Sequence, residues 1–224
     1  MICVAEKYGV VPPKFTKAWW SYFWDYYKWY VIGIGFAVIC IAATAVQCAT
    51  RREYDVTMTY AGQMVFDSEA SAAVENAAAE YTEDIDGNGE RAVFFQTLSI
   101  SGASGQEEYD YALQMKLDLE FQNERSFVFL FDKSQLELML ARDYVNDLFV
   151  PLSEWAGDTG GRETAAGSDG QVYAVDVSDS GFFEDIGVQC PGTYAVLRRN
   201  TYDDGENKMA YDSAVELLRA MIAD

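Results

Sequence analysis

The chain has 224 residues and is strongly acidic, with 36 Asp and Glu against 16 Lys and Arg and a net charge of −20. Only Glu6 and Asp25 among these acids precede residue 53, so the remaining residues carry 34 acids and 10 bases, and we exclude nucleic acid as a partner. The chain has no His, which excludes Ser-His-Asp and Cys-His triads and the common zinc sites. A pair of carboxylates is the catalytic option left, and no pair stands out among the many acids. We therefore expect that the protein is not an enzyme.

Residues 29–50 form an apolar segment without one charged side chain, and residues 19–30 before it are rich in Trp, Tyr and Phe. A helix rises about 1.5 Å per residue, so this segment reaches roughly 30 Å, the thickness of a bilayer's hydrocarbon core. Trp and Tyr favour the membrane interfaces. The sequence therefore predicts one transmembrane helix at 29–50 after a short segment, 1–28, with an aromatic belt.

The orientation follows from the charges beside the span. Lys14, Lys17 and Lys28 precede it, and Arg51 and Arg52 follow it. Positive residues stay in the cytoplasm, and a long domain is translocated largely regardless of its charge. We expect an uncleaved signal anchor in the cell membrane, with residues 1–28 cytoplasmic and residues 53–224 outside the cell.

Cysteine use predicts no disulfide within the expected extracellular domain, because Cys190 is its single Cys. A lone thiol outside the cell can be buried, can cross-link a dimer, or can persist in an anaerobic organism. We favour burial.

Residues 53–224 show strand and helix patterns in alternation. Residues 54–60 alternate apolar and polar side chains, which predicts a strand with Asp55 on its polar face. Residues 109–123 fit a helix, although Met115 to Phe121 also alternates like a strand, and length and propensity favour the helix. The other expected elements are a helix at 70–81 capped by Asp67 or Ser68, strands at 92–98, 127–131, 172–175 and 194–197, and helices at 135–142 and 209–222.

This alternation predicts an α/β domain with a mostly parallel sheet flanked by helices. Residues 157–170 are rich in Gly, Ser, Thr and Asp, and we expect a mobile loop there that separates two halves of the domain.

Three segments carry a resemblance to a known family. The strand at Phe127–Asp132, the helix after it and the stretch Leu148–Glu154 resemble the strand, helix and "LLPLDE" segment of extracellular solute-binding proteins of the type-2 periplasmic-binding fold. Asp169–Val175 is similar to their "DGKVYGVP" crossing. The anchor, the Ala-rich helix and the acidic turn also resemble uncharacterised single-span proteins of Gram-positive bacteria. The resemblance implies a sheet like that of one lobe of a binding protein.

The sequence departs from that family after the crossing strand. Asp176 stands where the family has Pro, and only about 18 residues, Val175 to Gly192, precede the returning strand. The family builds a second lobe there and grips its solute between two lobes. We therefore expect one lobe, and capture of a solute between lobes does not follow from the resemblance.

An acidic turn is the best ligand-like motif. Asp84, Asp86 and Asn88 are spaced like the oxygen ligands at positions 1, 3 and 5 of an EF-hand loop, Gly89 stands at position 6, and Glu90 supplies the carbonyl at position 7. Position 12, however, is Phe95 rather than the usual bidentate Glu. Two interpretations stay open, an Asx-rich turn from helix to strand and a weak Ca²⁺ site.

Function is predicted only at the level of class. The leading hypothesis is a membrane-anchored, non-enzymatic interaction module with a protein or small-molecule partner; the alternative is a small-molecule or Ca²⁺ sensor or transport accessory related to solute-binding proteins. Several aromatic residues are candidates either for a binding groove or for the core. They are Tyr109, Tyr111, Trp155, Phe182 and Phe183.

Overall fold

The computed structural model describes residues 12–49, 54–202 and 204–223. The chain divides into two compact units, Met1–Arg52 and Glu53–Asp224. The described part of the first unit is built around one helix, α1 (Lys17–Ala49). Thr50, the last residue of the predicted span, lies outside the described residues.

Helix α1 has the length and composition of a membrane span. Its segment Tyr27–Val46 has 20 residues and a mean hydropathy of 2.2, and none of it is buried against the rest of the chain. Among the described residues it is the one helix long and apolar enough to cross a membrane. Trp19, Phe23 and Tyr27 stack in succession along the start of the helix, with ring centroids 5.4 Å apart in each pair.

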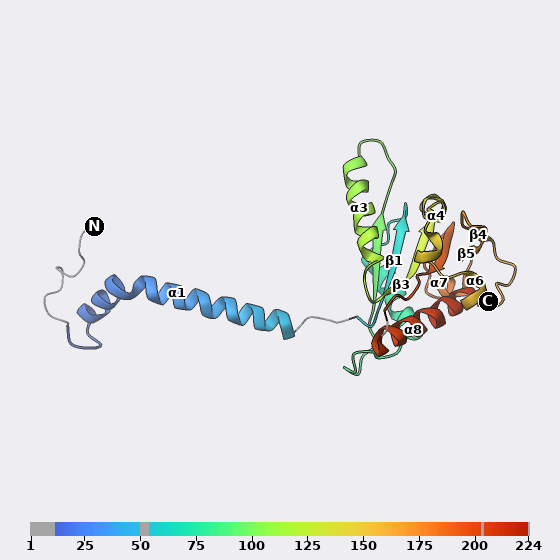
Figure 1. Cartoon of the computed structure of the whole chain (residues 1–224). Helices are drawn as coiled ribbons and strands as arrows, with labels where there is room; N and C mark the ends of the chain where they lie inside the picture. Colours follow the sequence, from blue (N-terminus) through green and yellow to red (C-terminus); the bar gives the residue numbers. More distant parts are fainter. Residues whose placement is uncertain (1–11, 50–53, 203, 224) are drawn as a thin grey trace. The chain divides into compact units, whose positions relative to one another are not determined.

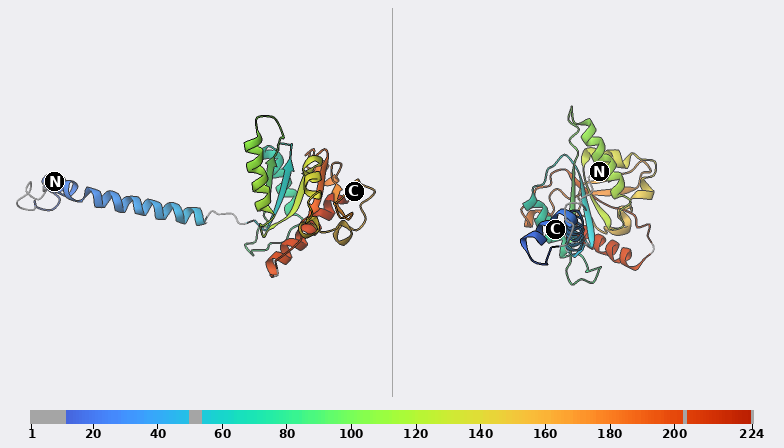
Figure 2. Two further views of the ribbon diagram at one scale, coloured as in Figure 1. Left: turned by 45° about the horizontal axis from the view of Figure 1, so that its top comes forward. Right: turned by 90° about the vertical axis from the view of Figure 1, so that its left-hand side faces the viewer.

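The second unit is an α/β domain with one six-stranded sheet and helices on both of its faces (Figures 1 and 2). The strand order is β2-β1-β3-β6-β5-β4. The strands are β1 (Val56–Gly62), β2 (Val93–Ser99), β3 (Ser126–Asp132), β4 (Thr164–Ala166), β5 (Val172–Asp176) and β6 (Thr193–Leu197). The helices are α2 (Ser68–Ala79), α3 (Glu107–Glu120), α4 (Lys133–Leu140), α5 (Val145–Leu148), α6 (Leu152–Trp155), α7 (Gly181–Asp185) and α8 (Gly205–Ile222).

The predicted α/β class is confirmed, and the sheet is mixed. Strand β1 pairs in parallel with both β2 and β3, as expected. The pairings β3–β6, β6–β5 and β5–β4 are antiparallel. These three pairings differ from the mostly parallel sheet that the sequence predicts. For β4 and β5 the reason is the short connection 167–171, because a parallel pair needs a crossover of a dozen or more residues.

The expected mobile loop at 157–170 is wrong in part. It contains β4, which pairs with β5 in a hairpin. It also does not separate two halves, because β6 lies between β3 and β5 and joins them in one sheet. A strand of three residues, mostly small and exposed, is too short to show a period in the sequence.

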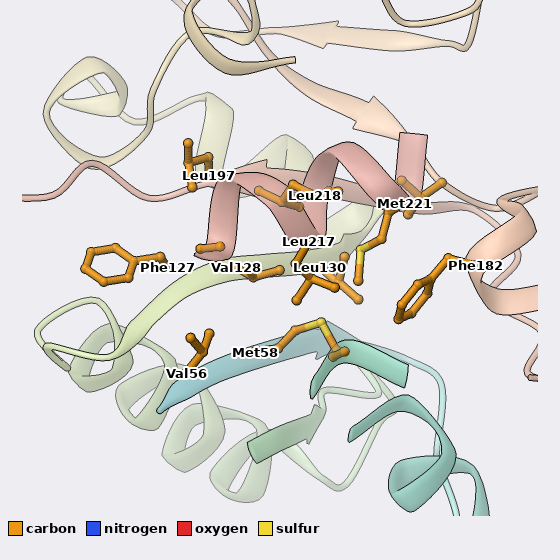
Figure 3. Packing of buried hydrophobic residues seen from close by; sticks show 14 of the residues in the cluster. Val56, Met58, Phe127, Val128, Leu130, Phe182, Leu197, Leu217, Leu218 and Met221 are labelled. Atoms are coloured by element: carbon orange, nitrogen blue, oxygen red, sulfur yellow. The ribbon is translucent and has the colours of Figure 1, made fainter. Parts of the chain in front are cut away.

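Strand β3 shows how the two faces of the sheet are filled. Val128 and Leu130 belong to a core cluster with Met58 of β1 and Leu217 of α8 (Figure 3). Phe129 and its neighbour Phe131 belong to the cluster on the other face, where α3 and α4 contribute. Each buried side chain of this size contributes roughly 1.5–3 kcal/mol. The central strand predicted at 127–131 is therefore confirmed.

Candidate functional site

The acidic turn, residues 84–90, lies between α2 and β2. The Asp84 carboxylate accepts the backbone N–H groups of Asn88 at 3.1 Å and Gly89 at 2.8 Å. The Asp86 carboxylate accepts the backbone N–H of Asn88 at 3.0 Å and its side-chain amide at 2.7 Å. Gly87 and Gly89 have φ of 71° and 89°, which only glycine adopts without strain. The Asx-rich turn predicted here is confirmed.

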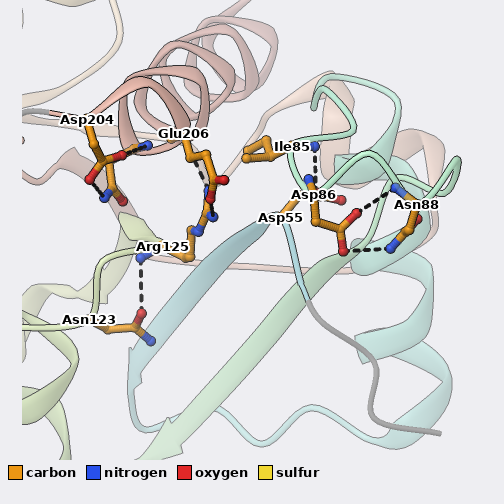
Figure 4. Close-up of polar contacts among 9 residues, drawn as sticks. Asp55, Ile85, Asp86, Asn88, Asn123, Arg125, Asp204 and Glu206 are labelled. Atoms are coloured by element: carbon orange, nitrogen blue, oxygen red, sulfur yellow. Dashed lines mark hydrogen bonds and ion pairs between the residues drawn. The ribbon is translucent and has the colours of Figure 1, made fainter. Parts of the chain in front are cut away.

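Asp55, just before β1, holds this turn against the sheet (Figure 4). It is 2% exposed. One carboxylate oxygen accepts the N–H groups of Ile85 at 2.7 Å and Asp86 at 3.3 Å, and the other accepts the N–H of Ala92 at 2.8 Å. The sequence pattern placed Asp55 on a polar strand face and missed this role. Its one signal was an acid directly before an apolar strand.

The turn and Asp55 form a group of acidic oxygens. Carboxylate oxygens of Asp55, Asp84 and Asp86 lie within 4.8 Å of one another. Ca²⁺ takes six to eight oxygen ligands, and carboxylates are its usual protein ligands. Three carboxylates supply part of such a shell.

The remaining predicted ligands are placed differently. The Asn88 side-chain oxygen accepts the Glu90 N–H at 2.7 Å inside the turn, as the carboxylates of Asp84 and Asp86 accept other N–H groups there. The Glu90 side chain is exposed and is not part of the acidic group. Phe95, at the twelfth position, is buried in β2 at 4% exposure. The structure therefore brings the carboxylates of Asp84 and Asp86 together with that of an unpredicted third acid, Asp55.

Ligands of open α/β sheets usually bind beyond the carboxyl ends of the strands, at the point where the strand order reverses. That point is at the carboxyl ends of the neighbouring strands β1 and β3. Here the Asp132 carboxylate accepts the N–H groups of Gln63 and Gln135, both at 2.8 Å. A Cβ on Gly62 would lie 2.9 Å from the Cβ of Asp132. The Asp132 side chain therefore occupies the space at this point, and the acidic group lies at the opposite, amino-terminal end of β1.

Helix α3 presents an apolar surface to solvent. Its one fully buried residue is Leu117. Tyr111, Met115 and Leu119 are 67%, 53% and 64% exposed. Their spacing of four residues places them along one side of the helix, roughly opposite Leu117. We call Tyr111, Met115 and Leu119 the outer stripe.

Three of the five aromatic candidates are core residues, and the other two are exposed. Trp155, Phe182 and Phe183 are 2%, 8% and 1% exposed and belong to the core. Tyr109 and Tyr111 are 58% and 67% exposed on α3. Tyr111 is part of the outer stripe, and Tyr109 lies on the same helix.

The single domain cysteine is buried, as expected. Cys190 is 1% exposed and packs in the core with α8. Burial raises the pKa of its thiol to about 12. The thiolate is the reactive form, so this side chain is a core residue rather than a nucleophile at neutral pH.

No protein family, no curated protein and no solved structure matches the chain. The resemblance to one lobe of solute-binding proteins therefore stays a prediction.

Proposed function

We propose that the protein is a membrane-anchored, non-enzymatic interaction module whose domain, residues 53–224, stands outside the cell and binds a protein partner through α3. The outer stripe carries this proposal. Contiguous exposed apolar surface on a soluble domain marks interaction sites, and Tyr is enriched in the energetic centres of protein interfaces. The helix α1 supplies the anchor, since it is long and apolar enough to span a membrane.

We infer the partner's chemistry from the charge around the outer stripe. Helix α3 carries Glu107, Glu108 and Asp110 in its first turn and Asp118 and Glu120 near its end, against the single base Lys116. A second copy of α3 would bring acids against acids, which costs free energy. A partner helix with apolar anchors flanked by Lys and Arg is complementary to this surface.

Site-specific photocrosslinking tests the proposal in the membrane of producing cells. A photoreactive phenylalanine analogue at Leu119 should give a discrete adduct with a second protein, and Tyr111→Ser with Met115→Ser should remove it. The analogue at Val65, which is 81% exposed and does not belong to α3, is the matched control. Equal adducts from both positions would contradict the proposal.

A peptide titration tests the partner's chemistry. The full chain in nanodiscs of zwitterionic lipid should bind an amphipathic Leu/Lys helical peptide and not its Leu/Glu counterpart, with empty nanodiscs as the blank. Met115→Ser with Leu119→Ser should weaken binding by about tenfold, or about 1.4 kcal/mol. Val65→Ser should leave it unchanged.

A lone lobe is consistent with this role. The segment from β5 to β6 holds only the short helix α7 among its regular elements, and β6 returns to the same sheet. A solute could not be clamped between two lobes of such a domain. We propose the kinship with solute-binding proteins as one of fold rather than of solute capture.

A Ca²⁺ sensor is the second candidate, and the acidic group of Asp55, Asp84 and Asp86 favours it. Ca²⁺ at a hundredfold excess over its dissociation constant would stabilise the native state by about 2.7 kcal/mol. The melting temperature should then rise in millimolar Ca²⁺, and Asp84→Asn with Asp86→Asn should abolish the rise. An unchanged melting temperature would remove this candidate.

A further inference from the structure

A slot between α4 and the β4–β5 hairpin forms a second, independent feature of the domain. It has a volume of about 330 Å³. This falls at the small end of the range of ligand sites, roughly 300–1,000 Å³. One wall is the side of α4 that carries Leu136 and Leu140, and the other includes Ala165 of β4.

The slot is held open by contacts at its two ends. At one end the Ser168 N–H donates to the Leu140 carbonyl at 3.0 Å, which ties the hairpin to the end of α4. At the other end the Glu163 carbonyl accepts the Asp176 N–H at 2.8 Å, which fixes the start of β4. The floor is apolar, because Leu136, Leu140 and Tyr194 are 2%, 6% and 4% exposed. These main-chain contacts fix the hairpin and tie it to the end of α4.

The charged groups around the slot are two carboxylates and one ammonium. Glu137, Glu163 and Tyr194 line it, and Lys133 is its one base. The Tyr194 hydroxyl donates to the Glu163 carboxylate, and burial together with this bond raises the pKa of Tyr194 to about 12, so the phenol stays neutral. Lys133 is held loosely, with its Nζ 4.0 Å from Glu163 and both side chains about two-thirds exposed. An ammonium group of a ligand can therefore displace Lys133 from Glu163.

We propose that this slot binds a small organic cation, a primary ammonium on a short apolar body. The ammonium lies between Glu163 and Glu137, and the apolar body lies against Leu136, Leu140 and Ala165. An anion of the same shape would meet two carboxylates with one mobile Lys to offset them, so the site discriminates by charge. The site is separate from the outer stripe of α3 and goes beyond the proposed interaction role.

Phenethylammonium is the probe that tests the slot, with phenylpropionate and phenethyl alcohol as its anionic and neutral counterparts. Binding is measured by isothermal titration to the full chain in zwitterionic nanodiscs, with empty nanodiscs as the blank. We expect saturable binding of the cation, at least about tenfold tighter than that of the anion. Equal binding of the three probes would overturn the proposal.

Three variants locate the binding. Glu163→Gln should weaken phenethylammonium binding several-fold, and Ala165→Trp, which fills the slot, should abolish it. Glu216→Gln removes the same charge from an exposed site on α8 and should change nothing. Because Trp at position 165 could unfold the hairpin, its melting temperature is measured as well, and Glu163→Gln alone decides the outcome if that variant unfolds. Equal losses in the Glu163 and Glu216 variants would show a general acidic surface and overturn the site.

Discussion

Helices α8 and α3 cover opposite faces of the same sheet and use their apolar residues in different ways (Figures 1 and 2). The 18 residues of α8 include a full buried face, whereas α3, with 14 residues, buries only Leu117 completely. The buried residues of α8 are Asn207, Ala210, Ser213, Ala214, Leu217, Leu218, Met221 and Ile222.

Packing therefore explains the apolar residues of α8 and only part of those of α3. Tyr111, Met115 and Leu119 stay more than half exposed, so the folded domain gains little from them. Residues that stability does not require are candidates for function. Matched substitutions in the two helices can separate these roles.

The largest effect is expected from Leu217→Ala in α8. Leu217 is 0% exposed in the core, so the variant loses the buried methyl groups and leaves a cavity. The expected loss is about 2–5 kcal/mol in the free energy of unfolding. Urea unfolding of the full chain in micelles, followed by circular dichroism, measures it. A loss below about 1 kcal/mol would mean that α8 is not the core helix described here.

A smaller effect is expected at Cys190, in the same core as α8. The pKa of its thiol is raised by burial from 9.0 to about 12, so the unfolded state releases the proton first as pH rises. The stabilisation is complete below about pH 9 and is lost progressively between about pH 9 and about pH 12. Iodoacetamide at about pH 8 should leave Cys190 unmodified until urea unfolds the domain, as read by mass spectrometry. Rapid labelling of the native protein would contradict the burial.

A third effect concerns how the two helices begin. The Asp204 side chain caps α8 by accepting the Asn207 N–H at 2.7 Å, whereas Gln106 makes no side-chain cap at the start of α3. That hydrogen bond and a second one, from the Asn207 side-chain amide, lower the pKa of Asp204 below its ordinary value of 3.8. The cap therefore stabilises the fold above this value and is lost as pH falls through the lower, folded pKa.

Acid unfolding measures this cap. The difference in urea midpoint between the wild type and Asp204→Ala should be larger at about pH 6 than at about pH 3. The same comparison with Gln106→Ala should show no such pH dependence, because Gln does not titrate. A difference for Asp204 that is independent of pH would contradict the cap.

The sequence predicted well the elements whose pattern is local and long. The strand at 127–131 and the helix at 209–222 are found within a few residues, because a continuous apolar run and a 3.6-residue period each identify one element. The helix at 109–123 was the ambiguous element and is α3. Its two apolar sides produced the ambiguity, since Met115, Leu117 and Leu119 alternate while pointing to opposite sides of a helix.

The sequence could not predict features that depend on distant pairing. Strand β4 is too short to carry a period, and the place of β6 between β3 and β5 is set by contacts across the sheet. The acidic group also depends on residues that are distant in sequence, because Asp55 lies about 30 residues before Asp84 and Asp86 along the chain. Only the fold brings the three carboxylates together.

The smallest effect on stability is expected from Leu119→Ala, the same chemical change as Leu217→Ala. Leu119 is 64% exposed, so truncation removes little buried surface and should change the free energy of unfolding by less than about 0.5 kcal/mol. The variant should nevertheless lose much of its binding to the Leu/Lys peptide, since the outer stripe supplies the apolar anchors of that contact. A large loss of stability would show that Leu119 belongs to the fold, and unchanged binding with unchanged stability would leave the stripe without a partner. Because the two Leu→Ala variants differ only in where the side chain lies, their comparison separates the apolar residues that build this domain from those that it presents.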